Sequence, residues 1–467
     1  MAEKHRLNID IVSIIILAIV NIAVYSRIFG SYLFADDFIQ YYSQRFDSLN
    51  ELMSGIIRSS AEYLFRPLHY LFLSVYYKLF YIDISLCYLL LFFAHLGAVI
   101  SVYYFLSGIK KDKRFGLIAA LLFLTFLGSW EVIGWTVAIY YPLVVIFLLS
   151  AIMLYNREKY VMSLIMFVFA LMTHEASILF IPLLLVYKVT IDHKKIDMQL
   201  FKGLFMSIFL TFAYLVFYLT RKYYLPVAGM ETQYKLGWHF IYNWLYYIST
   251  VFIPLVTSYR KAASLGGNII LGMNILKVSS VIIFLALFLY AAKKRLDLII
   301  YFSFWLIITL FPFVFFTTQP VARYLYVASV GVCAIFSFVI CTLLDGSRFR
   351  RIGVFVFLLI FSVNFLGMIA MQKIFTDKKE IRREIFAEMK SFKQIIHVKE
   401  RLCFVDMPIR EDEIKGMTYL LFKSDDFFIS TINADNVFYR PTFHPAIKQK
   451  YDRVFYYDCK GKKMNVL

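Results

Sequence analysis

Long apolar segments recur along the chain from its first residues to Gln372, and short polar loops separate them. Each segment has about 17 to 25 residues, enough to cross the hydrocarbon core of a bilayer as one helix. After Gln372 the pattern changes to mixed apolar and charged residues. The pattern therefore predicts an all-α polytopic membrane domain over residues 1–371 and a second domain over residues 372–467.

The basic residues predict the topology, because they cluster in short loops, and such clusters mark the cytoplasmic side of a membrane. Placing every cluster on that side predicts about eleven spans, a cytoplasmic N-terminus and an extracytoplasmic C-terminal domain. The first span is expected to stay as an anchor, since no small-residue cleavage site follows it. The predicted spans are residues 9–29, 84–106, 115–129, 138–155, 160–172, 177–189, 204–220, 269–291, 298–316, 324–344 and 352–371.

The same alternation of sides predicts that two long segments, residues 30–80 and 221–268, stay outside without crossing. Each contains an apolar stretch, so we expect an interfacial helix in each, from Arg66 to Phe80 and within Phe240 to Val256. The loops that face the cytoplasm in this scheme are Lys110–Arg114, Arg157–Lys159, Lys188–Lys202, Lys293–Arg295 and Arg348–Arg351.

The C-terminal segment is predicted to form a small extracytoplasmic α/β domain. Lys378 to Lys393 has the apolar spacing of an amphipathic helix. Short strand-like runs bounded by turn residues follow it. These runs are Leu402–Val405, Thr418–Phe422, Asp426–Ile432 and Arg453–Tyr457.

Composition supports the membrane class and narrows the partners. Of the 467 residues 61% are hydrophobic, and the formal net charge is +18. That charge lies in the loops between spans, so it needs no nucleic-acid partner. The five cysteines form no metal-binding spacing or disulfide framework. Cys403 and Cys459 could pair if the C-terminal domain faces an oxidising compartment.

Two adjacent carboxylates, Asp36 and Asp37, follow the first span. Carboxylates this close to a bilayer core are costly to desolvate, so the pair is a functional-site hypothesis. The competing interpretation is a solvated turn or a cap for the next helix, because aspartate favours both.

Further polar residues fall on the same outer side of the predicted topology. Carboxylates can accept a proton from an incoming hydroxyl, and guanidinium groups can hold a departing phosphate, so this set suits a lipid-linked phosphate substrate. The alternatives are that Arg66 and Arg323 snorkel to lipid headgroups and that His69 is an ordinary interfacial histidine. No phosphate-binding glycine loop, zinc spacing or nucleophile elbow is found. The set consists of Arg66, His69, Glu131, His174, Glu175, Arg323 and Tyr324.

Five short motifs occur in order along residues 1–371: Phe34-Ala-Asp-Asp-Phe38, Phe65-Arg-Pro-Leu68, Trp130-Glu-Val-Ile-Gly-Trp135, Thr173-His-Glu-Ala176 with Pro182 following, and Arg323-Tyr-Leu-Tyr326. Together they resemble the GT-C superfamily of glycosyltransferases that use polyprenyl-phosphate sugars. The order is most similar to the branch of protein O-mannosyltransferases with tetratricopeptide tails and their bacterial relatives. The chain departs from that branch at Ala322, where an acid is usual, and at Val327 to Ser329, where a proline-containing turn is usual. No tetratricopeptide repeats follow, so a protein acceptor does not carry over.

The resemblance implies an inverting glycosyltransferase of the bacterial plasma membrane, which moves a sugar from a polyprenyl phosphate to an acceptor. Whether that acceptor is a glycan, a lipid or a protein stays open. It implies that Asp36 is the base that activates the acceptor, with Asp37 assisting or orienting. Some relatives bind a divalent cation at such acids, which leaves a metal at Asp36, Asp37 and Glu175 open.

The residues suggest a clamp for the departing phosphate. Arg66 and Arg323 are its candidates, and Arg221 or Lys222 could contribute. Two other function classes compete with the transferase. A transporter or flippase of lipid-linked saccharides would show paired broken helices or inverted halves, which the sequence lacks. A non-catalytic membrane assembly factor would tolerate the loss of Asp36.

Overall fold

A computed structural model describes most of the chain. The described residues are 2–34, 36–62, 64–80, 84–195, 197–224, 234–252, 292–317, 321–405, 407–432, 451–458 and 463–466, together with positions 282, 285, 286, 288 and 289. The predicted span over residues 269–291 and the possible partner of Cys403, Cys459, therefore lie largely or wholly outside the described residues. The side chains of Arg221 and Lys222 are also outside the described part.

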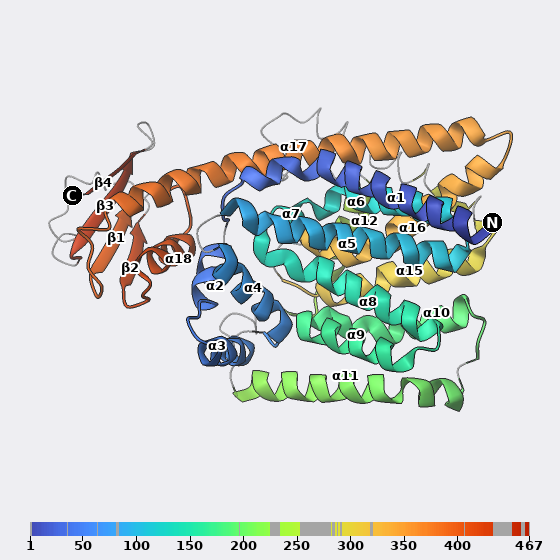
Figure 1. The fold of residues 1–467 in the computed structure, drawn as a ribbon, viewed down its shortest axis with the longest axis horizontal. Coiled ribbons are helices and arrows are strands. Elements are labelled where there is room, and N and C mark those ends of the chain that lie inside the picture. Colours follow the sequence, from blue (N-terminus) through green and yellow to red (C-terminus); the bar gives the residue numbers. More distant parts are fainter. Residues whose placement is uncertain are drawn as a thin grey trace.

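Long apolar helices pack side by side in a bundle, and the N-terminus and the C-terminal domain lie at its opposite ends (Figure 1). We call the end that carries Asp36 the Asp36 end. The helices of the bundle are α1 (Ala2–Tyr25), α5 (Ile84–Lys110), α6 (Lys113–Thr125), α7 (Trp130–Ile133), α8 (Tyr140–Asn156), α9 (Tyr160–Thr173), α10 (Phe180–Thr190), α11 (Met198–Tyr224), α15 (Leu296–Leu310), α16 (Leu325–Asp345) and α17 (Arg350–Ser391).

The helices confirm the class of polytopic membrane protein. Among the described residues, 7 helices are long and apolar enough to cross a membrane, or 8 if α6 and the segment after it, bent by 48°, form one span. Helix α9 is a shorter apolar helix of the same kind. The predicted number of eleven spans stays a prediction, because part of the chain is not described.

The end opposite Asp36 joins the N-terminal helix to two of the basic loops. Lys113 forms an ion pair with Asp10 of α1 at 2.7 Å, and Arg114 forms one with Asp345 of α16 at 3.1 Å. The structure thus groups these loops at one end, as the predicted alternation of spans requires. Which side of the membrane that end faces stays a prediction.

Short helices cover the Asp36 end of the bundle. They are α2 (Asp37–Ser43), α3 (Leu49–Glu62), α4 (Pro67–Phe80) and α12 (His239–Phe252). The helices expected over residues 66–80 and within 240–256 are both present. Asn243 of α12 donates to the backbone carbonyls of Val314 and Phe316 at 2.9 and 2.8 Å, which ties α12 to the segment after α15.

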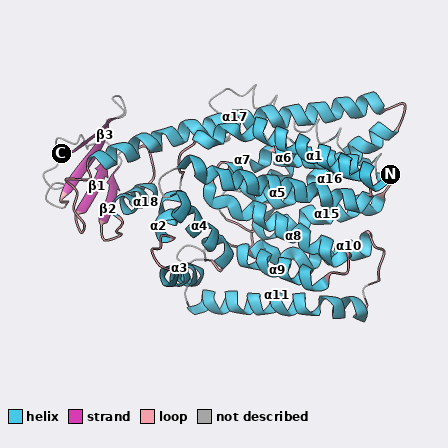
Figure 2. Ribbon diagram, viewed as in Figure 1, coloured by secondary structure: helices cyan, strands magenta, loops and turns pink. Residues whose placement is uncertain are grey.

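Helix α17 is continuous from the last span into the C-terminal domain and is 42 residues long. The predicted domain boundary at residue 371 falls inside this helix. The strands that follow form one sheet at the end of the molecule, with α18 beside it (Figure 2). The elements are β1 (Arg401–Val405), α18 (Glu411–Phe422), β2 (Phe428–Ile432), β3 (Arg453–Asp458) and β4 (Lys463–Val466).

The sheet has the order β2-β1-β3-β4. Strand β1 is parallel to both β2 and β3, and Cys403 pairs with Ser430 on one side and Val454 on the other. Strand β4, which the sequence did not predict, is antiparallel to β3.

One predicted strand, Thr418 to Phe422, is wrong, because these residues end α18. Three acidic residues fill the first turn of that helix, where they favour the positive end of its dipole. The apolar run is therefore the buried face of a helix.

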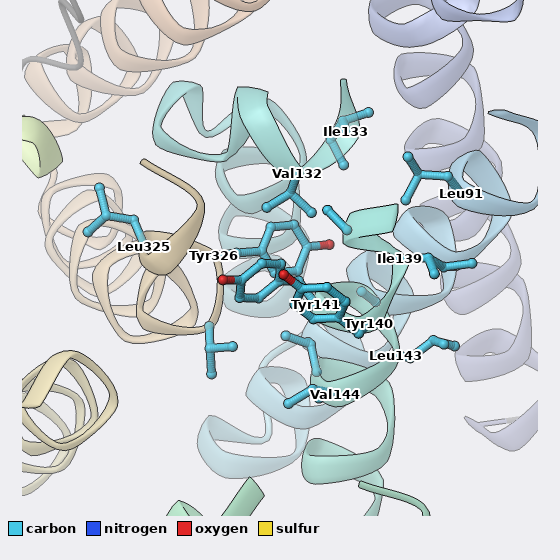
Figure 3. Close-up of a cluster of buried hydrophobic side chains, with 14 of the residues drawn as sticks. Leu91, Val132, Ile133, Ile139, Tyr140, Tyr141, Leu143, Val144, Leu325 and Tyr326 are labelled. Carbon is cyan, nitrogen blue, oxygen red and sulfur yellow. The ribbon is translucent and has the colours of Figure 1, made fainter. Parts of the chain in front are cut away.

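An aromatic core lies beneath the Asp36 end. Tyr140, Tyr141 and Tyr326 pack together, with Val132 and Leu325 around them (Figure 3). The rings of Tyr140 and Tyr141 lie 4.5 Å apart, and those of Tyr141 and Tyr326 lie 6.2 Å apart. These ring contacts join α8 to α16 beneath the polar residues of the Asp36 end.

Candidate active site

Asp37 is the first residue of α2, and its side chain is fully buried. Its carboxylate accepts three hydrogen bonds, from the Thr136 hydroxyl at 2.7 Å, the Val137 backbone N–H at 3.1 Å and the Phe34 backbone N–H at 2.9 Å. Burial raises the pKa of Asp37, and these donors oppose the rise. The interpretation as a solvated turn is therefore wrong for Asp37, which connects α2 to the short 3-10 helix η3 (Thr136–Ile139).

A buried lysine, absent from the sequence-based site, supports Asp37. Lys379 lies in α17, and its ammonium donates to the Tyr88 hydroxyl at 2.6 Å. Tyr88 in turn donates to the backbone carbonyl of Tyr32 at 3.1 Å. The positive charge of Lys379 stabilises the ionised form of Asp37, as a buried charge requires.

Asp36 precedes α2 and faces solvent instead. It occupies the position of a helix cap, yet its side chain makes no capping hydrogen bond. Its carboxylate accepts from Arg410 Nη2 at 3.1 Å, and its side chain is 44% exposed. Arg410 belongs to the C-terminal domain and stands 374 positions away in the sequence, so no local pattern could have revealed this contact.

Asp36 and Asp37, with the residues that bind them, form the first cluster of the site. The second cluster is formed by Arg66, His174 and Glu175. Arg66 binds Glu175 with two parallel hydrogen bonds, Nε to Oε2 at 2.8 Å and Nη2 to Oε1 at 2.6 Å. His174 Nδ1 accepts from the Ala176 backbone N–H at 3.0 Å, and its Nε2 lies 3.0 Å from Arg66 Nη2. The guanidinium lies over the ring of Tyr140, 4.7 Å from its centre.

Electrostatics hold this cluster in one protonation state. Burial alone would raise the pKa of Glu175, but Arg66 outweighs it and lowers that pKa to about 2. Burial, and then Arg66, lower the pKa of His174 to about 3. Near neutral pH the cluster therefore contains a charged Arg66–Glu175 pair and a neutral His174.

His69 lies beside the second cluster. Its ring is buried and stands edge-on to Tyr140 at 5.0 Å. Burial, followed by Arg66, lowers the pKa of His69 well below its usual value. Within the described residues, its Nδ1 atom has no hydrogen-bond partner. His69 is thus a neutral group, and its Nδ1 atom is buried.

The third cluster is formed by Arg323 and Glu131. Arg323 Nη1 donates to Glu131 Oε1 at 2.5 Å, and the backbone N–H of Arg323 donates to Oε2 at 3.3 Å. The guanidinium lies 5.1 Å from the ring centre of Trp135 and 5.3 Å from that of Tyr324. The Tyr324 ring stacks on Phe313 at 4.1 Å, which fixes its position.

One turn, residues 135–141, meets all three clusters. Trp135 contacts Arg323, Thr136 and Val137 bind Asp37, and Tyr140 lies under Arg66. The clusters therefore belong to one site, although their residues come from segments far apart in the sequence.

The nine residues expected at the site all lie at the Asp36 end, but the two aspartates point to different environments. Sequence reasoning missed four residues that the structure adds. Lys379 and Tyr140 lie in helices whose sequence pattern shows no special feature at these positions, and Thr136 and Arg410 act through long-range contacts. These additions are Thr136, Tyr140, Lys379 and Arg410.

The carboxylates do not gather into a metal-binding set. No group of three or more His, Cys, Asp or Glu side chains in the described part of the chain is arranged to hold an ion. Arg66 binds both oxygens of Glu175, and Asp37 accepts three hydrogen bonds. The metal that the resemblance left open stays a prediction.

No protein-family model matches the chain, and no curated protein matches it. Among solved structures the chain is similar to the crystal structure of ArnT from Cupriavidus metallidurans bound to undecaprenyl phosphate. The two share 13% sequence identity with a TM-score of 0.48, over 91% of this chain and 90% of that chain. A likeness this distant carries no argument about function, so the function must be argued from the residues of the site.

Proposed function

We propose that the chain is an inverting glycosyltransferase, which moves a sugar from a polyprenyl-phosphate donor to a hydroxyl of a glycan, lipid or protein acceptor. The observation that carries the proposal is one site at the end of a membrane bundle. In it, one segment, residues 135–141, binds Asp37, the neighbour of the exposed Asp36, and contacts two arginines that are each paired with an acid. The motifs quoted above support the same function.

The two arginines are the proposed phosphate clamp. Glu175 takes Nε and Nη2 of Arg66, and Glu131 takes Nη1 of Arg323, which leaves other N–H groups of both guanidiniums to point at a ligand. Each arginine–glutamate pair is neutral overall, so directed hydrogen bonds rather than net charge would hold the phosphate.

Other polar atoms at the site also lack a hydrogen-bond partner within the described residues. Within the described residues, the buried indole N–H groups of Trp130 and Trp135 have no hydrogen-bond partner, like His69 Nδ1. Buried donors without partners are rare in folded proteins. A bound sugar phosphate would supply acceptors for them.

The proposed reaction is a single displacement. The acceptor oxygen attacks the anomeric carbon while its proton passes to Asp36, and the bond from that carbon to the phosphate oxygen breaks. The electron pair leaves with the polyprenyl phosphate, whose charge Arg66 and Arg323 stabilise. Asp37 holds the turn that carries Trp135 and Tyr140 and is a positioning residue.

The test is the stereochemistry of transfer. The full chain in lipid nanodiscs is given a polyprenyl-phosphate sugar of known anomeric configuration, and the product is examined by nuclear magnetic resonance. The proposal expects cleavage of the donor and inversion at the anomeric carbon. Retention of configuration, or movement of the intact donor across the membrane without cleavage, would overturn it.

The site is proposed to face the outside of a bacterial plasma membrane. Single cysteines replacing Asp47 and Lys111 test this, because the two lie at opposite ends of the bundle. A membrane-impermeant maleimide added to intact cells should label the cysteine at position 47 and leave the one at 111 unlabelled. The reverse pattern would place the site on the cytoplasmic side.

A further inference from the structure

The C-terminal domain is docked on the helix that follows Asp36. Helices α2 and α18 begin at the same place, where Asp36 meets Arg410, and run in the same direction, since the Tyr42 and Tyr419 rings also meet, at 5.3 Å. A Cβ atom on Gly416 would lie 2.7 Å from both the Phe38 Cβ and the Ile39 backbone nitrogen. The two helices therefore approach so closely that position 416 has no room for a side chain.

The docking does not depend on Arg410. Arg382 of α17 binds Glu413 of α18 with hydrogen bonds of 2.9 to 3.2 Å, and the Glu413 side chain is only 1% exposed. The Arg382 guanidinium also lies 4.5 Å from the ring centre of Phe34. These buried contacts hold the domain in place whether or not Arg410 binds Asp36.

Arg410 itself is loosely held and has a second partner. Its side chain is 59% exposed, and the same Nη2 atom that contacts Asp36 at 3.1 Å lies 3.0 Å from Asp412. Exposed ion pairs are weak. Because Arg410 contacts Asp36 and Asp412 at the same time, it can release Asp36 while Asp412 still holds it, and the domain stays docked.

We propose that Arg410 is a specificity-determining residue, which occupies Oδ1 of Asp36 until an acceptor binds and so keeps that oxygen from taking a proton from water. The proposal rests on the proposed function. If Asp36 were free, a water oxygen could attack the anomeric carbon while its proton passed to Asp36. The bond to phosphate would break, which would release free sugar and polyprenyl phosphate.

An acceptor can displace Arg410 where water cannot. A water molecule brings almost no binding energy of its own, whereas an acceptor can use contacts made by its non-reacting parts to move Arg410 aside. The partners of the two aspartates come from different parts of the chain, because Arg410 of the C-terminal domain contacts Asp36 and Thr136 of the bundle contacts Asp37.

The test measures release of free sugar from a labelled polyprenyl-phosphate sugar by the full chain without acceptor. Arg410→Gln should raise this hydrolysis about two- to fivefold, the range that one exposed ion pair supports, and Arg410→Lys should raise it less. The matched control is Arg401→Gln, which removes a pair of similar exposure, Arg401–Asp452 at 3.2 Å, elsewhere in the same domain. The control should leave hydrolysis unchanged.

A second variant covers the case in which Arg410→Gln does not fold. Asp412→Asn removes the alternative partner of Arg410, so Arg410 should stay on Asp36 and hydrolysis should fall. Unchanged hydrolysis in Arg410→Gln would overturn the proposed role of Arg410, and so would an equal rise in Arg401→Gln. Neither result would contradict the proposed glycosyltransferase activity. A wild-type chain that neither transfers nor hydrolyses any polyprenyl-phosphate sugar would instead overturn the proposed function.

Discussion

Asp36 and Asp37 are identical neighbours in the sequence, yet the structure places them in opposite environments. Asp37 is buried, accepts three hydrogen bonds and has the charge of Lys379 nearby. Asp36 is exposed and shares one exposed arginine, Arg410, with Asp412. A carboxylate satisfied on every side is suited to fix structure, whereas one with a weak partner remains able to take a proton.

The difference also separates two parts of the molecule. Asp37 belongs to the bundle side, where it holds the turn under the arginine clusters. Asp36 belongs to the contact between the bundle and the C-terminal domain. Substitutions at the two positions should therefore change different properties of the protein, and the predictions below exploit this.

The largest effect on stability is expected at Asp37. Asp37→Ala leaves the Thr136 hydroxyl and two backbone N–H groups without their acceptor. The expected loss is about 3–5 kcal/mol, because each buried donor left without an acceptor costs about 1–3 kcal/mol. Thermal unfolding in detergent measures it, with Asp36→Ala as the control, for which less than about 1 kcal/mol is expected. Equal losses of unfolding free energy in Asp37→Ala and Asp36→Ala would contradict the different roles of the two aspartates.

A smaller and more selective effect is expected at Arg323, which touches the turn that Asp37 holds. Arg323→Ala should weaken polyprenyl-phosphate binding about tenfold or more, the cost of lost hydrogen bonds to a charged group. Arg323→Lys should restore only part of the affinity, because lysine lacks the planar fork. Binding is measured by isothermal titration in nanodiscs. Full affinity in both variants would return Arg323 to the snorkelling interpretation.

An effect on stability smaller than that at Asp37 is expected at Gly416, on the Asp36 side of the comparison. A methyl group there would push α18 away from Phe38 and Ile39, so Gly416→Ala should cost about 1–3 kcal/mol through overpacking and loosen the C-terminal domain. Limited proteolysis of the domain reports the loosening. Gly55→Ala is the matched control, because a Cβ at that helical glycine meets no atom within 4 Å. Equal protection of the two variants from proteolysis would show that the contact between α2 and α18 tolerates the methyl group.

The sequence predicted most of the fold, because membrane-spanning helices follow from apolar length and charge in the loops. It failed for the run Thr418 to Phe422, since a short apolar run does not distinguish a strand from the buried face of a helix. It also could not predict that α17 continues without a break past residue 371.

The sequence could predict which residues belong to the site, but not which of them contact one another. Acids and arginines stand out in an apolar sequence, so Arg66, Glu175, Glu131 and Arg323 could be grouped by their predicted side of the membrane. Which acid meets which arginine depends on packing between helices more than a hundred positions apart. The role of Arg410 depends on the docking of a whole domain, which no periodicity encodes.

The central claim is that Asp36 acts as the base, and Asp36→Asn tests it most directly. The amide keeps the shape of the side chain but cannot take the proton, so transfer should fall about 10²- to 10⁴-fold while donor binding and thermal stability stay at wild-type levels. The rate is measured in a single turnover with bound polyprenyl-phosphate sugar and saturating acceptor. Wild-type transfer by a well-folded Asp36→Asn protein would contradict the claim.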